Sequence, residues 1–356
     1  MKETIITAAI FIFLLLFIPF AFAGTAKSVH TAVPVHASSS EASGESAAEE
    51  GGGVTVAGAE SGAGQFRIRS VSTGREEDVA AFDFICGVVA GEMPVEYEPE
   101  ALKAQAAAAF SYCAFLREHP TGDGSIVTGL HVAYLPRAQA QTLWGSQFDA
   151  NWAKIVSAVE AVRGYALFYG GEVALACYSD MSSGTTESSA DVWNQALPYL
   201  VEVPSPGDKL EKDYLSHVTV KSADFARTAE ALPGAKLQKD PRAWLRVTKR
   251  SAAGGVLEAA LGGKAVTGAQ VRSWFGLRSA NFSLSYKKGV FTFTVRGYGH
   301  GVGMSQCGAE YLAKQGKSWR QILAWYYRGA AVGEYDWSGS GNSGGSGGSG
   351  TPASRL

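Results

Sequence analysis

Alternating apolar and polar positions predict strands in two parts of the chain. The alternation is clear over Phe66–Arg69 and over Asn281–Arg296, where Lys288-Gly289 divides the second run into two strands. The run Tyr165–Tyr178 is interrupted by Gly170-Gly171 and predicts a β-hairpin. These segments are too short and too far apart to form a repeating βαβ unit.

Longer apolar patterns predict helices between the strands. A helix opens at Pro99, because proline is favoured in the first helical turn, and continues through an alanine run to about Leu116. The further helices expected from their patterns and end signals are Trp152–Arg163, Phe225–Ala231, Thr267–Phe275, Ser305–Gln315 and Ser318–Tyr327. Helices and antiparallel strands mix without a regular rhythm, so we expect an α+β fold in one compact domain over residues 66–337.

The two ends of the chain differ from this domain. Ile5–Ala23 is free of charge and would span roughly 28 Å as a helix, about one bilayer core. Residues 1–23 are therefore either a membrane anchor or a signal peptide cleaved after Ala21-Phe22-Ala23, and both place the rest outside the cytoplasm. Residues 24–65 and 338–356 are rich in small and polar residues, and we expect a disordered linker and a disordered tail.

Composition narrows the function classes. A formal net charge of −2 gives no support for nucleic-acid binding, which needs a basic face. The four cysteines are widely spaced and form no CxxC pair, which excludes zinc-ribbon and thioredoxin-type sites. If the chain is exported, the cysteines could pair, and the sequence does not decide this.

Glu92 is the first candidate for chemistry. It follows the apolar segment 83–90, which we interpret as strand-like, and we place it in a short loop before the helix that begins at Pro99. Pro94 restricts the backbone of Met93. A carboxylate held against apolar neighbours has a raised pKa, as a general acid requires. The residues alone leave open that Glu92 is an ordinary solvated carboxylate.

A second segment, residues 179–200, combines hydroxyls, carboxylates and aromatic rings. Hydroxyl and carboxylate groups can hydrogen-bond with sugar hydroxyls, and aromatic rings offer flat apolar faces. The candidate substrate-binding residues here are Ser182, Ser183, Thr186, Glu187 and Asp191. The alternative is a polar loop around a core tryptophan, Trp193.

A third segment places glycine at every second position from Gly297 to Gly303. The spacing GxGxGxG differs from the GxGxxG of dinucleotide-binding loops, which excludes that function. Glycine permits close backbone approach, so we expect this loop to face a sugar in the same cleft as Glu92. His300, Ser305 and Gln306 are the candidate contacts, although His300 could equally be a structural histidine.

Together the three segments resemble the stage II sporulation protein D family, which includes the amidase-enhancer proteins. The resemblance extends from about Asp78 to Arg328. It implies an anchored or secreted, extracytoplasmic protein that binds peptidoglycan glycan strands and acts with a cell-wall amidase similar to stage II sporulation protein P. It also implies a lytic transglycosylase of spore engulfment whose catalytic acid is Glu92.

Such an enzyme can work with one carboxylate. Most glycosidases use two. In a lytic transglycosylase the C6 hydroxyl of N-acetylmuramic acid attacks C1 and forms a 1,6-anhydro sugar, so the nucleophile belongs to the substrate. Two alternatives stay open: a non-catalytic peptidoglycan-binding module that activates an amidase, and a muramidase in which water attacks.

The chain departs from the family at three places. Some members bind zinc through a His/Cys pair, but the matching segment Gln139–Gly145 carries neither ligand. We therefore expect no metal and no other cofactor. Phe110 stands where the family usually has an arginine, and Ser179 where it often has a histidine.

Overall fold

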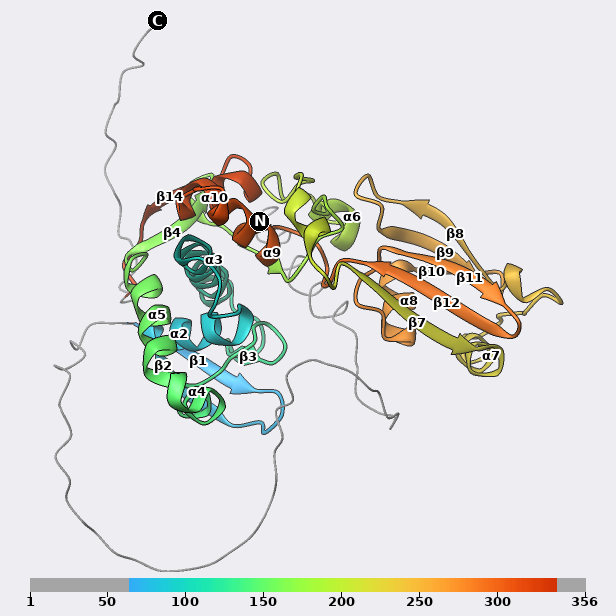
Figure 1. The fold of residues 1–356 in the computed structure, drawn as a ribbon, viewed down its shortest axis with the longest axis horizontal. Helices are drawn as coiled ribbons and strands as arrows, with labels where there is room; N and C mark the ends of the chain where they lie inside the picture. Colours follow the sequence, from blue (N-terminus) through green and yellow to red (C-terminus); the bar gives the residue numbers. More distant parts are fainter. Residues whose placement is uncertain (1–63, 338–356) are drawn as a thin grey trace, which may run out of the picture. The chain divides into compact units, whose positions relative to one another are not determined.

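The structure, a computed structural model, describes residues 64–337 (Figure 1). The anchor or signal peptide predicted for residues 1–23, the tail at 338–356 and nearly all of the linker at 24–65 lie outside these residues. Within residues 64–337, no helix is long and apolar enough to cross a membrane. The described chain is a mixture of helices and mainly antiparallel sheets, which confirms the α+β prediction.

Two hydrophobic cores organise the described chain. The first core is built from both ends of it, residues 64–210 and 302–337. Its elements are β1 (Gln65–Ser70), β2 (Glu76–Ala80), α2 (Ala81–Glu92), α3 (Pro99–Glu118), β3 (Ile126–Thr128), α4 (Arg137–Trp144), α5 (Phe148–Glu160), β4 (Tyr165–Tyr169), β5 (Glu172–Val173), β6 (Tyr178–Ser179), α6 (Ser189–Trp193), the 3₁₀ helix η2 (Pro206–Leu210), β13 (Met304–Ser305), α9 (Gln306–Lys314), α10 (Trp319–Tyr326) and β14 (Ala331–Glu334).

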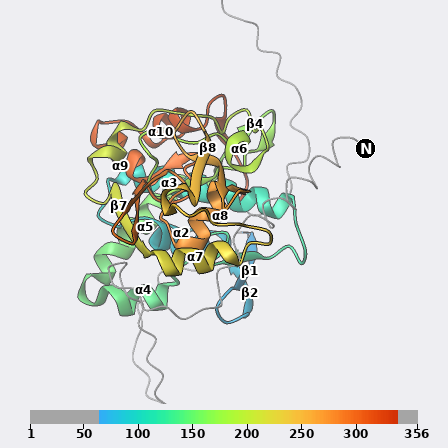
Figure 2. The same cartoon turned by 90° about the vertical axis from the view of Figure 1, so that its right-hand side faces the viewer.

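The helix α3 is the centre of the first core. Its alanine run, Ala104–Ala109, is fully buried, and small side chains let neighbouring helices approach closely. Figure 2 shows α3 with α2 and α5 on one side and α9 and α10 on the other, and all four contact it. Phe110 on the same helix stacks on Trp337 with ring centroids 3.9 Å apart. Phe110, which stands where the family usually has an arginine, is thus a residue of the hydrophobic core.

The second core is built from one continuous stretch, residues 215–296. Its elements are β7 (Leu215–Lys221), α7 (Ser222–Glu230), β8 (Leu245–Arg250), β9 (Val256–Leu261), β10 (Lys264–Thr267), α8 (Gly268–Phe275), β11 (Phe282–Lys287) and β12 (Val290–Arg296). They form two antiparallel sheets of order β10-β9-β8 and β11-β12-β7. Phe225 of α7 stacks on Phe291 at 4.1 Å, which holds α7 against the second sheet.

Most predicted elements are confirmed, and one is wrong. Residues 83–90 belong to the helix α2, and Glu92 is the last residue of that helix rather than part of a loop. The helix is buried on most sides because it contacts both α3 and α5. A helix buried on all sides lacks the apolar stripe that identifies helices, so its sequence looks like a buried strand. The helix α4 and the sheet β10-β9-β8 were not predicted.

Candidate functional site

Glu92 is held in a defined position at the C-terminal end of α2. Its side chain is half-buried, and Oε1 accepts a hydrogen bond from the backbone N–H of Ala133 at 2.5 Å. Burial raises the pKa of Glu92 to about 7, and the nearby charge of Asp180 adds to this. The hydrogen bond from Ala133 and the polar side chains of Gln306 and Tyr178 offset part of the increase. Glu92 is therefore a carboxyl group that gains and loses its proton near neutral pH.

Two neighbours of Glu92, Gln306 and Tyr178, come from segments that are distant in sequence. Gln306, the first residue of α9, is buried and donates from Nε2 to Oε1 of Gln105 on α3 at 3.4 Å. Nε2 of Gln105 has no hydrogen-bond partner among residues 64–337, although it is buried. Tyr178 belongs to β6, which pairs in parallel with β13 directly before α9. The pairing of β6 with β13 thus brings Tyr178 and Gln306 to the same place.

Asp180 is a second carboxylate near Glu92, and sequence reasoning passed over it. Its Oδ1 accepts a weak hydrogen bond from Sγ of Cys307 at 3.5 Å, and Oδ2 lies 4.0 Å from Arg278. Burial raises the pKa of Asp180 as well.

Gln105 was also missed by sequence reasoning. Gln105 is a single polar residue inside a run of alanines. A polar side chain buried there needs a hydrogen-bond partner, and this could have identified it.

His300 is a neutral histidine with both ring nitrogens in use. Nδ1 accepts from the N–H of Val302 at 3.0 Å, so the proton lies on Nε2, which hydrogen-bonds to the backbone of Tyr178. Burial, together with the charge of Arg272, lowers the pKa of His300 to about 4. His300 therefore joins the glycine loop to Tyr178, the residue whose phenol contacts Glu92.

The alternate glycines pack against the backbone of the protein itself. All four have positive φ, from 73° at Gly297 to 102° at Gly299. A Cβ at Gly303 would lie 1.9 Å from the carbonyl oxygen of Cys177, and one at Gly297 would lie 2.7 Å from that of Met181. The interpretation that the glycines admit a sugar needs correction, because the backbone they admit is that of the chain's own segment 177–187.

Three candidate residues are engaged inside the protein. Ser182 and Ser305 both donate from Oγ to the buried carboxylate of Asp208, at 2.5 Å and 2.8 Å. Burial raises the pKa of Asp208 to about 6. Thr186 donates from Oγ1 to Val201 and accepts from the N–H of Val203. The hydroxyls of these three residues therefore form hydrogen bonds within the protein in this structure.

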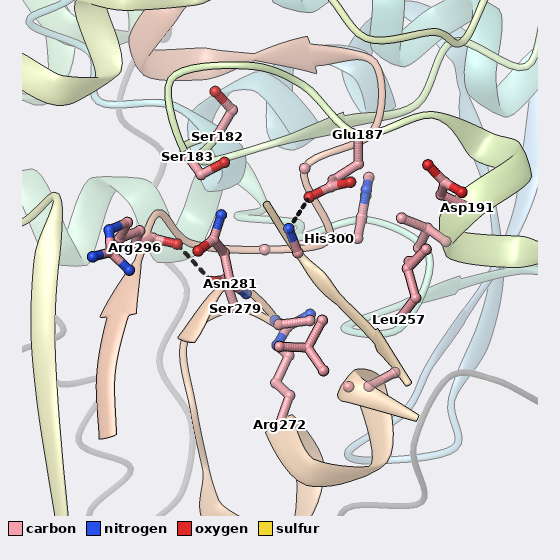
Figure 3. Close-up of a pocket in the computed structure, with 18 of the residues that line it drawn as sticks. Ser182, Ser183, Glu187, Asp191, Leu257, Arg272, Ser279, Asn281, Arg296 and His300 are labelled. Carbon is pink, nitrogen blue, oxygen red and sulfur yellow. Dashed lines mark hydrogen bonds between the residues drawn. The ribbon is translucent and has the colours of Figure 1, made fainter. Parts of the chain in front are cut away.

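Four further candidates, together with Ser182, line a pocket of about 170 Å³ (Figure 3). Ser183, Glu187, Asp191 and His300 lie on one side of it, with residues of α8, β9 and β12 on the other. Glu92 is not among the residues that line this pocket. Tyr178 connects Glu92 with His300, so the expectation of one shared cleft stays a prediction.

No group of three or more histidine, cysteine or acidic side chains that could hold a metal ion occurs among residues 64–337. All four cysteines are free and buried in this structure. The absence of a metal stays a prediction, which elemental analysis of the purified, untagged protein tests.

Comparison with known proteins places this chain in a family. Residues 72–169 match the family model described as Stage II sporulation protein (SpoIID). The chain is 37% identical over 266 residues to stage II sporulation protein D of Bacillus amyloliquefaciens and 35% identical over 266 residues to that of Bacillus subtilis strain 168, covering 73% of this chain and 76% of each relative. It is also 27% identical over 300 residues to the amidase enhancer of Bacillus subtilis strain 168, with 70% of this chain and 40% of that protein covered. The chain therefore belongs to the stage II sporulation protein D family.

Proposed function

We propose that this protein is a lytic transglycosylase that cleaves the glycan strands of peptidoglycan, with Glu92 as its catalytic acid and base. The observation that carries the proposal is the environment of Glu92. A carboxyl group whose pKa is raised to about 7 keeps a large protonated fraction at neutral pH. It is anchored by Ala133, so its position is fixed while its proton is transferred.

The reaction needs one proton to leave Glu92 and one to return. Protonated Glu92 donates to the glycosidic oxygen as the bond between C1 of N-acetylmuramic acid and that oxygen breaks. The C6 hydroxyl oxygen then forms a bond to C1, and the Glu92 carboxylate takes the proton of that hydroxyl. The product ends in a 1,6-anhydro sugar, and Glu92 is protonated again without the use of water.

Gln306, Tyr178 and Asp180 have supporting roles in this proposal. The polar side chains of Gln306 and Tyr178 lower the pKa of Glu92 and would stabilise the carboxylate that forms when the proton leaves. Asp180 is a second carboxylate near Glu92 and would stabilise positive charge that develops on the sugar. Glu187 and Asp191, the acidic candidates for substrate binding from the sequence, line the pocket of Figure 3.

The cellular setting is part of the same proposal. The sporulation relatives and the resemblance suggest that the enzyme acts outside the cytoplasm, attached to the membrane or secreted, in spore engulfment. The similarity to an amidase enhancer supports a cell-wall amidase as a partner. A non-catalytic activator of such an amidase is the second candidate function, on the strength of that similarity.

One experiment separates the candidates. Purified glycan strands are incubated with wild type, with Glu92→Gln and with the control Glu96→Gln, whose exposed carboxylate lies four residues away. Mass spectrometry then identifies the chemical form of the new glycan ends. We expect anhydro ends from wild type and Glu96→Gln and none from Glu92→Gln. Reducing ends would indicate a hydrolase. Intact strands, together with amidase activation that Glu92→Gln retains, would indicate a binding module.

A further inference from the structure

The pocket shown in Figure 3 contains an unpaired cation. Arg272 lies on α8, is half-buried and donates from Nε to the carbonyl oxygen of Leu277 at 3.3 Å. Within the described part of the chain, no carboxylate forms an ion pair with it. Burial lowers the pKa of Arg272, because the cation is only partly solvated. A half-buried cation in a pocket, with one carbonyl partner and no ion pair, points to an anionic ligand.

A second buried polar group in the pocket also lacks a partner. Glu187 is 7% exposed, and its Oε1 accepts the N–H of Gly255 at 3.1 Å. Its Oε2 is buried and has no hydrogen-bond partner among residues 64–337. An acceptor left in this state favours a ligand that brings an N–H or O–H group. The pocket thus offers Arg272 to an anion and Glu187 to a hydrogen-bond donor, and Arg296 and Asp191 also line it.

The remaining walls restrict what can enter. His300 is neutral and uses both ring nitrogens within the protein, so it supplies a ring face rather than a charge. Trp193 packs on that ring with centroids 5.2 Å apart. A volume of about 170 Å³ admits one small group and no length of polymer.

We propose that this pocket binds a carboxylate of the cell-wall polymer, with Arg272 as the anchor and Glu187 as the acceptor beside it. The planar guanidinium matches a carboxylate in geometry as well as in charge. The choice of polymer rests on the proposed function. Two of its parts carry this chemistry: the lactyl arm of N-acetylmuramic acid and the terminal α-carboxylate of a stem peptide.

Two matched pairs of small probes test the proposal on the wild-type full chain. The first pair is N-acetylmuramic acid and its methyl ester, and the second is N-acetyl-D-alanyl-D-alanine and its amide. Affinities are measured by NMR titration. We expect the acid of one pair to bind at least tenfold more tightly than its neutral analogue, and that pair identifies the source. Equal affinities in both pairs, or no binding by any probe, would overturn the proposal.

Variants then locate the anchor. Arg272→Gln should weaken binding of the preferred acid at least tenfold and leave the neutral analogue unchanged. Arg246→Gln, an exposed arginine on β8, is the matched control and should behave as wild type. Glu187→Gln should keep the preference for the acid, because the cation remains. A preference that survives Arg272→Gln, or one that Glu187→Gln abolishes, would contradict the assignment. The titration measures binding and needs no glycan cleavage. A failure of the proposed activity and a failure of the proposed binding site are therefore distinguishable.

Discussion

At the scale of single residues, Glu92 has two measurable properties that follow from one environment. Burial at the end of a helix makes the charged form unfavourable, and the negative end of the helix dipole acts in the same direction. The same environment affects both the reaction and the stability of the folded protein.

The first prediction concerns rate against pH. If protonated Glu92 is the acid, kcat/KM should fall about tenfold per pH unit above pH 7, since the pKa is raised to about 7. Glu92→Gln should lower the rate by a factor of about 10²–10⁴ at pH 7 and below, and its own rate should not show this fall above pH 7. Release of anhydro-ended product between pH 5 and 9 measures both. A flat profile through pH 9 for wild type would exclude Glu92 as the acid.

The second prediction concerns stability. The folded-state pKa of Glu92, about 7, lies above its ordinary value of 4.5, so the folded state binds the proton more tightly. Stability is fully present below pH 4.5 and is lost as pH rises towards 7. Glu92→Gln removes this loss and should raise the free energy of unfolding at pH 8 by on the order of 1–3 kcal/mol relative to its effect at pH 4.

Urea denaturation of wild type and Glu92→Gln at both pH values tests this. The exposed control Glu96→Gln should show the same small effect at pH 4 and pH 8. If the difference between wild type and Glu92→Gln does not depend on pH, the pKa of Glu92 is not raised in the folded state.

At the scale of elements, the glycine loop shows which part of the sequence interpretation was sound. The positive φ values were predictable from glycine at every second position. The partner was not, because the contact with Cys177 and Met181 depends on the pairing of β6 with β13, two residues in each strand. A pairing that short leaves no pattern in the sequence.

The third prediction compares two glycines with the same backbone conformation. Gly303 has φ 76° and Gly316 has φ 77°, but a Cβ meets the Cys177 carbonyl only at Gly303 and has open space at Gly316. Gly316→Ala should cost about 1–2 kcal/mol from backbone strain alone. Gly303→Ala should cost more than about 3 kcal/mol, because the backbone must also shift. Thermal unfolding measures both, and equal costs would mean that the loop is not tightly packed.

At the scale of the whole molecule, the mixture of helices and antiparallel strands was predictable, and the arrangement around the candidate site was only partly so. Glu92 and Gln306 were candidates from their motifs. Arg272 was not, because a cationic residue on an amphipathic helix usually faces water. The partial burial of Arg272 depends on how residues 215–296 fold, and the sequence around Arg272 carries no pattern that predicts this packing.

The fourth prediction concerns the start of the folded chain. The N–H of Gly64 donates to the carbonyl of Trp337 at 3.0 Å, and its own carbonyl accepts from Ala81 at 2.7 Å. A chain that begins at Gly64 should therefore keep the glycan cleavage and the melting temperature of the full chain. One that begins at Phe66 loses both hydrogen bonds and should melt several degrees lower. Loss of activity on truncation to Gly64 would show that the preceding residues contribute to the domain.

The contact between Gln105 and Gln306 joins residues 201 positions apart. A ribosome must therefore make nearly the whole domain before the surroundings of Glu92 can assemble, and a partly made chain lacks the groups that tune the acid. Under the proposed function, this sets a time order between synthesis of the chain and cleavage of glycan. The proposed cleavage would begin only after synthesis has passed α9, so a chain that ends before α9 would lack it.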